Sequence, residues 1–428
     1  MSRYSKSLWT RRRMLGASAM ALAAPVVAPR RAWAASNEIR VGWVSPTTGP
    51  IAGFGQTDDF VFGQLQSTIA AGLDIDGKHY DVKIIRKDNQ SNPNRSAEVA
   101  SELILDDEVH LMLSSSTGDT VIPVSDQCEL NEVPSVSADT PWDAFFFARG
   151  GDPAKGFDWT HHFFWGSGQA VGTFSALWGQ LENNNRVGLL MANDGDGVAM
   201  SHPEVGMAAS LRKLGHEVID LGLFEPMSDD FSAQIGKLKD ANVDILMGVF
   251  VPPDWVTFWA QAHQQGFNPK AATIAKALLF PSSVEAVGPT AVGLSTEIWW
   301  SPGHPFKSSI TGQSAADFCA EWTAKTGKQW VQPKGFKHAL LEVGLDVLKR
   351  SGDPMDPGAV VESIRGTDLD TMVGHINFMT GPVPNVSATP LVGGQWRQGT
   401  QFPFELAICD NSLAPEIATQ SEMRPLTY

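Results

Sequence analysis

The feature that most constrains the fold is an alternation of short apolar runs with segments of helical periodicity. In the first part of the chain, strands are predicted at 39–44, 82–85, 109–113 and 133–136, and helices at 97–105 and 121–130. A strand, a helix and a second strand in succession build a parallel sheet with helices on its faces. The chain is therefore predicted to be an α/β protein with doubly wound parallel sheets.

This alternation stops at an irregular, aromatic stretch over 140–168 and then starts again. The second series predicts strands at 187–191, 216–221, 243–251 and 272–275, and helices at 204–214, 231–239 and 254–265. Two comparable lobes separated by a hinge fit this pattern better than one large sheet. Further helices are predicted at 314–326 and 337–351. The tail after Gly381 is predicted to be irregular, because Pro, Gly and polar residues are scattered through it.

The first 34 residues have the pattern of an export signal. Three arginines, Arg11 to Arg13, precede a weakly hydrophobic, alanine-rich run, and a small-x-small sequence ends at Ala34. The run is shorter than the roughly 20 residues that span a bilayer, and Pro25 interrupts it. We therefore expect cleavage after residue 34, export by the twin-arginine route and a periplasmic protein with no membrane span in its mature chain.

The charge of the remaining chain excludes several classes of partner. All 47 Asp and Glu residues lie beyond residue 34, against 25 Lys and Arg (the total of 32 less the seven in the leader). A net charge of −22 repels phosphate backbones and anionic lipids, so neither nucleic acid nor a membrane surface is an expected partner. We expect a monomer that binds a small molecule.

No catalytic or metal-binding motif stands out. The chain contains no GxSxG elbow and no HExxH helix, and the acidic sequence at 193–197 cannot complete an EF-hand loop. Its three cysteines form no CxxC pair, and an odd number leaves at least one thiol unpaired. We therefore predict no enzyme, no catalytic residue, no metal and no cofactor.

Polar loops follow two neighbouring predicted strands. The sequence Ser-Ser-Ser-Thr-Gly at 114–118 ends one strand and opens a helix, and Ser-Ala-Asp-Thr at 137–140 follows the next strand. Unpaired backbone N–H groups and hydroxyls meet at such a sheet edge and suit a carboxylate or another small anion. An ordinary helix cap is the alternative reading of the first loop.

Several segments together resemble a known family. Those at 39–56, 88–93, 133–137 and 230–239, with the serine loop at 114–118, match in order the substrate-binding proteins of ABC transporters of the Leu/Ile/Val type. The resemblance implies a type I periplasmic binding protein, in which two lobes joined by three hinge crossovers close over a ligand and deliver it to permease subunits. It places lobe one at 37–165 plus 301–375, and lobe two at 166–300 plus 376–428.

The resemblance also implies roles for individual residues. The family positions that hold the ligand's carboxylate correspond here to Ser114, Ser115, Ala138 and Thr140. The aromatic residue over the ligand corresponds to Phe54, and the lobe-two tyrosines correspond to Phe250 and Asp196. Relatives that bind amino acids place a carboxylate after the strand that ends here at Ala275, whereas this chain has Lys276. Because a cation there repels an ammonium group by a few kcal/mol, we expect a small organic acid, aromatic or apolar, with Lys276 on a second anionic group.

Four alternatives stay open. Lys276 could form a salt bridge across the closed cleft with Asp139, Asp196 or Asp254. The ligand could be an amino acid or amide whose amine meets Asp139 or Asp196. The lobes could serve a signalling receptor. An exported hydrolase is the fourth, and the missing catalytic motifs disfavour it.

Overall fold

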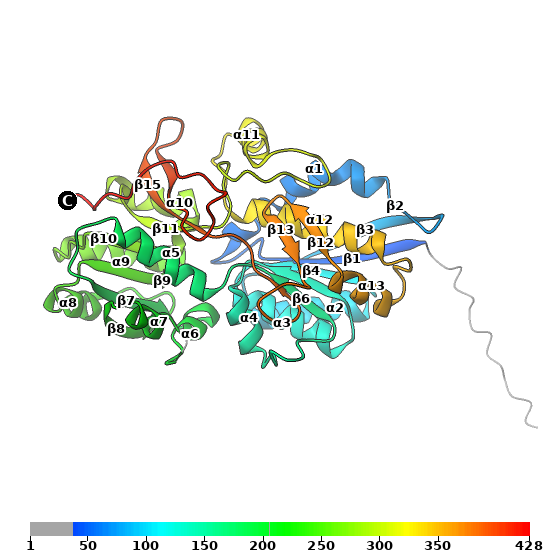
Figure 1. The fold of residues 1–428 in the computed structure, drawn as a ribbon, viewed down its shortest axis with the longest axis horizontal. Helices are drawn as coiled ribbons and strands as arrows, with labels where there is room; N and C mark the ends of the chain where they lie inside the picture. The colour runs from blue at the N-terminus through cyan, green and yellow to red at the C-terminus, as the bar shows by residue number, and fades with distance from the viewer. Residues whose placement is uncertain (1–36, 205) are drawn as a thin grey trace, which may run out of the picture. The chain divides into compact units, whose positions relative to one another are not determined.

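The computed structural model describes residues 37–204 and 206–428, so the leader predicted at 1–34 lies outside the described residues. The first of two seven-stranded sheets has the strand order β14-β6-β5-β4-β1-β3-β2 (Figure 1). All neighbours are parallel except β2 and β3, which form a hairpin. Its strands are β1 (Glu38–Ser45), β2 (Leu73–Ile75), β3 (Lys78–Asp88), β4 (Leu111–Ser115), β5 (Ser135–Ala138), β6 (Thr160–Phe163) and β14 (Val386–Ser387).

Helices flank this sheet. They are α1 (Asp58–Ala70), α2 (Pro93–Leu105), α3 (Gly118–Leu130), α4 (Trp142–Ala148), α11 (Ala315–Thr326), α12 (Pro333–Arg350) and α13 (Pro357–Arg365). A 3-10 turn, η1 (Ala52–Phe54), and a small hairpin, β12 (Asp368–Thr371) with β13 (Gly374–Asn377), complete the lobe. Helix α2 begins four residues before the predicted start at Ala97, because the Asn92 side chain accepts a hydrogen bond from the backbone N–H of Arg95 and Pro93 occupies the first turn.

The second sheet has the order β16-β15-β11-β10-β9-β7-β8. Its strands are β7 (Arg186–Ala192), β8 (Glu217–Phe224), β9 (Ile245–Phe250), β10 (Ala271–Lys276), β11 (Ser295–Ile298), β15 (Val392–Gln398) and β16 (Phe404–Asp410). The helices are α5 (Ser167–Gly179), α6 (Gly195–Met200), α7 (Met207–Lys213), α8 (Ser232–Asp240), α9 (Pro252–Gln264) and α10 (Pro281–Val287), with 3-10 turns η2 (Ala277–Leu279) and η3 (Gly288–Ala291).

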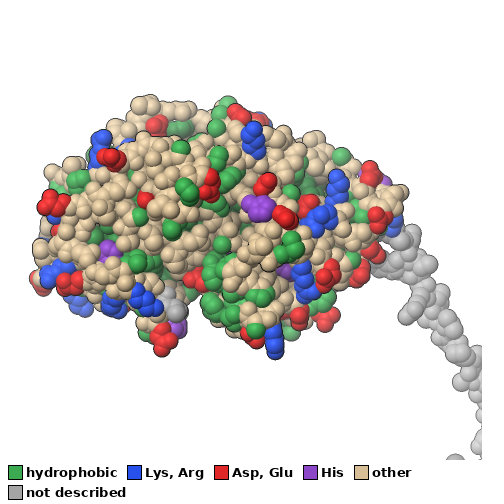
Figure 2. All heavy atoms as spheres, viewed as in Figure 1, with side chains coloured by type: hydrophobic (Ala, Val, Ile, Leu, Met, Phe, Trp, Pro, Cys, Tyr) green, Lys and Arg blue, Asp and Glu red, His purple; other side chains and the backbone are tan. Residues whose placement is uncertain are grey.

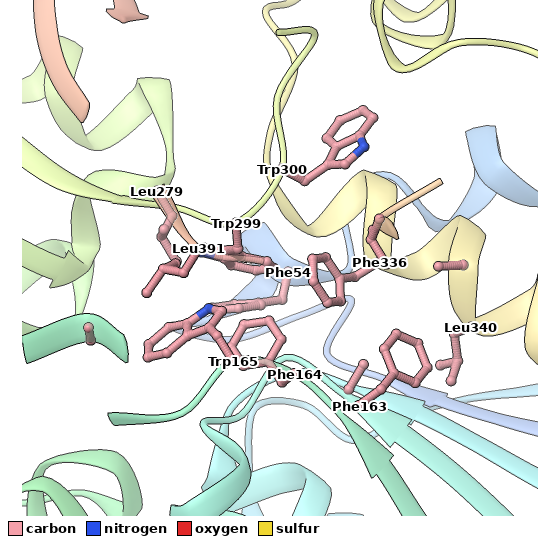
Figure 3. Close-up of a cluster of buried hydrophobic side chains, with 14 of the residues drawn as sticks. Phe54, Phe163, Phe164, Trp165, Leu279, Trp299, Trp300, Phe336, Leu340 and Leu391 are labelled. Carbon is pink, nitrogen blue, oxygen red and sulfur yellow. The ribbon is translucent and has the colours of Figure 1, made fainter. Parts of the chain in front are cut away.

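The chain crosses between the sheets three times, after β6, after β11 and after β14. Aromatic rings pack where these crossovers meet (Figure 3). Phe164 on the first crossover lies edge-on to Trp299 on the second, with ring centroids 4.9 Å apart, and Phe336 of α12 contacts both rings. The predicted fold class, two doubly wound lobes joined by three crossovers, is thereby confirmed.

The tail differs from the irregular structure that its composition predicts. Strands β15 and β16 form an antiparallel hairpin on the edge of the second sheet, with β15 paired to β11. The glycines of β15 serve close packing, because a Cβ on Gly394 would lie 2.1 Å from Cδ1 of Ile298. Strand β14 pairs with β6, so 386–387 adds to the first sheet rather than to lobe two.

Two further observations concern the described residues alone. None of their helices combines the length and apolar character that crossing a membrane requires. Cys128, Cys319 and Cys409 are all buried and unpaired.

Candidate functional site

A small cavity lies between the two lobes, close to the crossovers. Aromatic rings of Phe54, Phe164, Trp165 and Trp299 line it, together with the polar side chains of Thr117, Asp139, Asp196, Lys276 and Glu297. Its volume is about 40 Å³, room for a few water molecules, since one water needs at least about 10–15 Å³. The two lobes therefore lie close together, with little free space between them.

The opening loop of lobe one covers one side of the cavity. The Phe54 ring, at the end of η1, lies edge-on to Phe280 of lobe two, with centroids 5.2 Å apart. The preceding residue must be small, because a Cβ on Gly53 would approach the Phe280 ring to 2.8 Å. Phe54 lines the cavity, and its place over a ligand stays a prediction.

The predicted carboxylate-binding loops contact each other. The Ser115 hydroxyl donates to Oδ2 of Asp139, and the Thr140 hydroxyl donates to the carbonyl of Ser116 at 3.2 Å. Ser114, Ser115, Ala138 and Thr140 thus lie behind the cavity wall rather than in it. Thr117 and Asp139 form the wall instead, and the hydroxyl of Thr117 and Oδ1 of Asp139 have no hydrogen-bond partner among the described residues.

A buried lysine lies beneath these loops. Nζ of Lys337, on α12, donates to the Ser45 hydroxyl at 2.7 Å and to the Ser115 carbonyl at 2.9 Å. It also lies 3.5 Å from Oδ1 of Asp58, whose other oxygen accepts a hydrogen bond from the Trp43 indole. Burial raises the pKa of Asp139 to about 7, and the charge of Lys337 only partly opposes this shift.

Lys276, which we expected to face the ligand's anionic group, is already neutralised. Its Nζ lies 2.7 Å from Oδ2 of Asp194 and 2.9 Å from Oδ2 of Asp196, and the side chain is 6% exposed. Burial alone would lower the pKa of Lys276, but Asp196 and Asp194 together raise it above its ordinary value. Both partners belong to lobe two, so these ion pairs do not cross the cleft.

Glu297 is a cavity residue that the sequence reading missed. It lies on β11 and is 2% exposed. Its Oε1 accepts from the backbone N–H of Lys276 at 3.2 Å, and its Oε2 from the Thr296 hydroxyl at 2.9 Å. Burial raises its pKa to about 7. The sequence feature that could have revealed Glu297 is that it is the one acidic residue in a strand of buried, uncharged residues.

Phe250 does not cover the cavity as expected. Its ring packs in the core of lobe two, 4.9 Å from Phe224 and 5.3 Å from Phe258, and it is fully buried. Successive side chains of a strand point to opposite faces, so Val249 reaches the cavity and Phe250 turns away. Asp254 is buried in the first turn of α9 and does not line the cavity either.

Carboxylates outnumber cations in and directly around the cavity. The acids are Asp58, Asp119, Asp139, Asp194, Asp196 and Glu297, and the lysines are Lys276 and Lys337. Fully ionised, these described residues carry four excess negative charges. On the outer face in Figure 2, by contrast, acidic and basic side chains are interspersed. Acidic side chains thus predominate in and around the cleft.

Comparison with known proteins identifies the class. Residues 38–392 match the periplasmic binding protein family, and the chain belongs to that family. It is a solute receptor of the kind that serves ABC importers, which confirms the resemblance read from the sequence. Family membership also implies a periplasmic location.

The relatives and solved structures are distant. Leu/Ile/Val-binding protein homolog 3 of Brucella melitensis is 21% identical over 360 residues, 81% of this chain and 88% of the relative. The leucine-binding protein LivK of Thermotoga maritima superposes with a TM-score of 0.71 at 19% identity, covering 87% of this chain and 99% of that one. A solute-binding protein of R. palustris in complex with 4-hydroxybenzoate gives 0.70 at 14% identity, covering 91% and 98%. Likeness at this level establishes the fold, so the ligand has to be inferred from the cleft.

Proposed function

We propose that this protein is a periplasmic receptor that delivers a small amino acid or amide to an ABC importer. The observation that supports this ligand class is the pair of buried carboxylates, Asp139 and Glu297, in a cavity whose lysine is already paired. In this proposal an amine or amide N–H of the ligand donates to these carboxylates. The aromatic rings of Phe54 and Phe164 contact its apolar body.

Electrostatics favour a cationic or donor group over a bare anion. The pKa values of Asp139 and Glu297 near 7 show that burial disfavours their ionised forms, and at Asp139 the charge of Lys337 only partly opposes this effect. An ammonium group at 4 Å from one of them gains about 4 kcal/mol at an effective dielectric of 20, and a carboxylate there loses about the same. A free acid would add a further negative charge to a cleft in which carboxylates already outnumber lysines.

A small organic acid is the second candidate, because the cavity also offers donors. The indole N–H groups of Trp165 and Trp299 lack a partner among the described residues, as does the Thr117 hydroxyl. These donors suit a carboxylate or carbonyl oxygen, and the R. palustris protein in complex with 4-hydroxybenzoate supports this candidate. Such an acid would have to bind together with a proton on Asp139 or Glu297.

Closure follows from contacts with both lobes in either case. A ligand that touches Asp139 of lobe one and Glu297 of lobe two makes both contacts only when the lobes are together, so it shifts the population towards the closed state. We propose no catalytic residue, no metal and no cofactor. The receptor is proposed to act as a monomer, exported by the twin-arginine route that residues 11–34 suggest.

Calorimetric titration at several pH values separates the two ligand classes. Isoleucine, phenylalanine, phenylalaninamide and 4-hydroxybenzoate would be titrated at pH 6, 7 and 8 into protein freed of bound solute by unfolding and refolding. An acid that binds with a proton should weaken by up to tenfold per pH unit as the pH rises through 7, whereas an amine should bind equally well or better.

The Asp139→Asn variant tests the same distinction by mutation, because it removes the charge and keeps the size of the side chain. An amine ligand should lose about 1.5–3 kcal/mol of binding free energy. An acid ligand should bind more tightly, and its affinity should depend less on pH. If the amines fail to bind and 4-hydroxybenzoate binds more weakly at higher pH, the ligand is an organic acid and our first choice is wrong.

A further inference from the structure

Two hydrogen bonds between backbone and carboxylate join the lobes beside the cavity. The backbone N–H of Gly118, at the start of α3 in lobe one, donates to Oδ1 of Asp196 at 3.2 Å. In the other direction, the backbone N–H of Gly195, at the start of α6 in lobe two, donates to Oδ1 of Asp119 at 2.8 Å. Each helix N-terminus is thus capped by a carboxylate from the facing helix of the other lobe.

Glycine at both donor positions makes this approach possible. A Cβ on Gly195 would lie 2.7 Å from Oδ1 of Asp119, and one on Gly118 would lie 3.1 Å from Oδ1 of Asp196. The carboxylates can therefore reach the N–H groups that α3 and α6 leave free in their first turns. These groups also carry the positive end of the helix dipole, which attracts the negative charge.

Like charges crowd this contact and repel one another. The charged groups that face Asp119 are Asp196, Lys276 and Asp194, and the only cation of this described set is already paired with Asp194 and Asp196. Burial, followed by the charge of Asp196, raises the pKa of Asp119 to about 6. An ionised Asp119 is thus less favourable when the cleft is closed than when it is exposed to water.

We propose that Asp119 and Asp196 form a clasp that holds the two lobes closed, with Lys276 as its buried counter-charge, and that closure in mildly acidic solution takes up a proton at Asp119. This role does not depend on the identity of the ligand. It gives Lys276 a role in the cleft although its charge is paired with Asp194 and Asp196. Open and closed states differ in two hydrogen bonds and, below about pH 6, also in the protonation of the Asp119 carboxyl.

Distances between spin labels on the two lobes test the clasp without any ligand. Phe147→Cys on α4 and Val198→Cys on α6 provide the labelling sites, because the two positions are 51% and 53% exposed and the three native cysteines are buried. Double electron–electron resonance on the ligand-free protein then gives the ratio of closed to open molecules. We compare the labelled parent with Asp119→Asn, which keeps an oxygen acceptor without the charge, and with Asp119→Ala, which removes the acceptor.

At pH 7.5 the Asn variant should be more closed than the parent and the Ala variant more open. We divide the closed-to-open ratio of the parent by that of the Asn variant. When the pH falls from 7.5 to 5, this quotient should rise about tenfold, because the pKa of Asp119 is about 6 in the closed state and the ordinary 3.8 in the open state. Effects of Asp139 and Glu297 are common to both proteins and cancel in this comparison.

Asp317→Asn is the control, since Asp317 lies in the first turn of α11 and bonds locally to Ser314. It should leave the distance distribution unchanged. If the Asn and Ala variants both match the parent at pH 7.5 and 5, with unchanged melting temperatures, the clasp is refuted. That result would leave the proposed ligand class untouched, because the calorimetric test of that class depends on Asp139 instead.

Discussion

Replacing Lys276 by methionine tests whether this residue supports the folded cleft or binds the solute. Methionine has a similar length and no charge, so the change isolates the loss of the ammonium group. The variant leaves Asp194 and Asp196 close together, with side chains only 10% exposed, and without the cation that both contact within 3 Å. A ligand-binding lysine, by contrast, could be removed with little effect on the stability of the empty protein.

The expected magnitude follows from the burial of the pair. Removing one partner of a buried ion pair leaves an uncompensated charge and typically costs about 3–5 kcal/mol of unfolding free energy. The upper part of that range applies here, because one lysine serves two carboxylates. Lys270→Met is the control, since Lys270 contacts Asp244 at 3.1 Å but is 45% exposed, and an exposed pair contributes only about 0–1 kcal/mol.

Urea unfolding followed by tryptophan fluorescence measures both variants at pH 7.5 and 5. The deficit of the Lys276→Met variant should shrink at pH 5, because the neighbouring Asp119, whose pKa is about 6, is then largely protonated and no longer repels Asp194 and Asp196. A loss below about 1 kcal/mol at pH 7.5, similar to that of Lys270→Met, would show that the ion pairs contribute little to the fold. Lys276 would then again be a candidate for direct ligand contact.

Three further predictions concern other parts of the molecule. Phe54→Ala removes the ring over the cavity. It should weaken binding of the solute found by calorimetry by at least about 0.5–1.5 kcal/mol, and an unchanged dissociation constant would count against a role of Phe54 in binding. Asp58→Ala leaves the buried Lys337 without its carboxylate and should lower the unfolding free energy by about 3–5 kcal/mol in urea titrations, whereas a change below 1 kcal/mol would contradict the pairing. Gly394→Val should destabilise the β15–β16 edge, because its Cβ would lie 2.1 Å from Ile298, and a melting temperature equal to that of the parent would disprove the close packing.

Local sequence patterns predicted most central strands of the two sheets because each depends on nearby residues, but they missed β6, which lies in the stretch expected to be irregular, and β11. The strand predicted at 82–85 lies within β3, and the helix predicted at 97–105 lies within α2. The tail was mistaken for irregular structure, since β15 contains the pair Gly393 and Gly394. Glycine normally weakens a strand, and only contact with neighbouring elements shows that it is needed there.

The candidate site was only partly predictable. Phe54, Asp196 and Lys276 line the cavity as expected, because the order of strands and loops places them at the facing ends of the two sheets. Glu297 was missed, and Phe250 faces the core of lobe two instead. Which face a side chain takes depends on the pleat of its strand, and a shift of one residue reverses it.

The sequence by itself determined the fold class, the two-lobe organisation and the family, since periodicity and an ordered series of motifs are properties of the chain. Only the tertiary structure decided what the charges of the cleft do. From the sequence, Lys276 is predicted to bind an anionic group of the ligand. In the structure its ammonium group is paired with Asp194 and Asp196, both within 3 Å. Because the effect of a charge depends on neighbours that are distant in sequence, spacing along the chain could not show that this cleft is acidic and that its lysine is already paired.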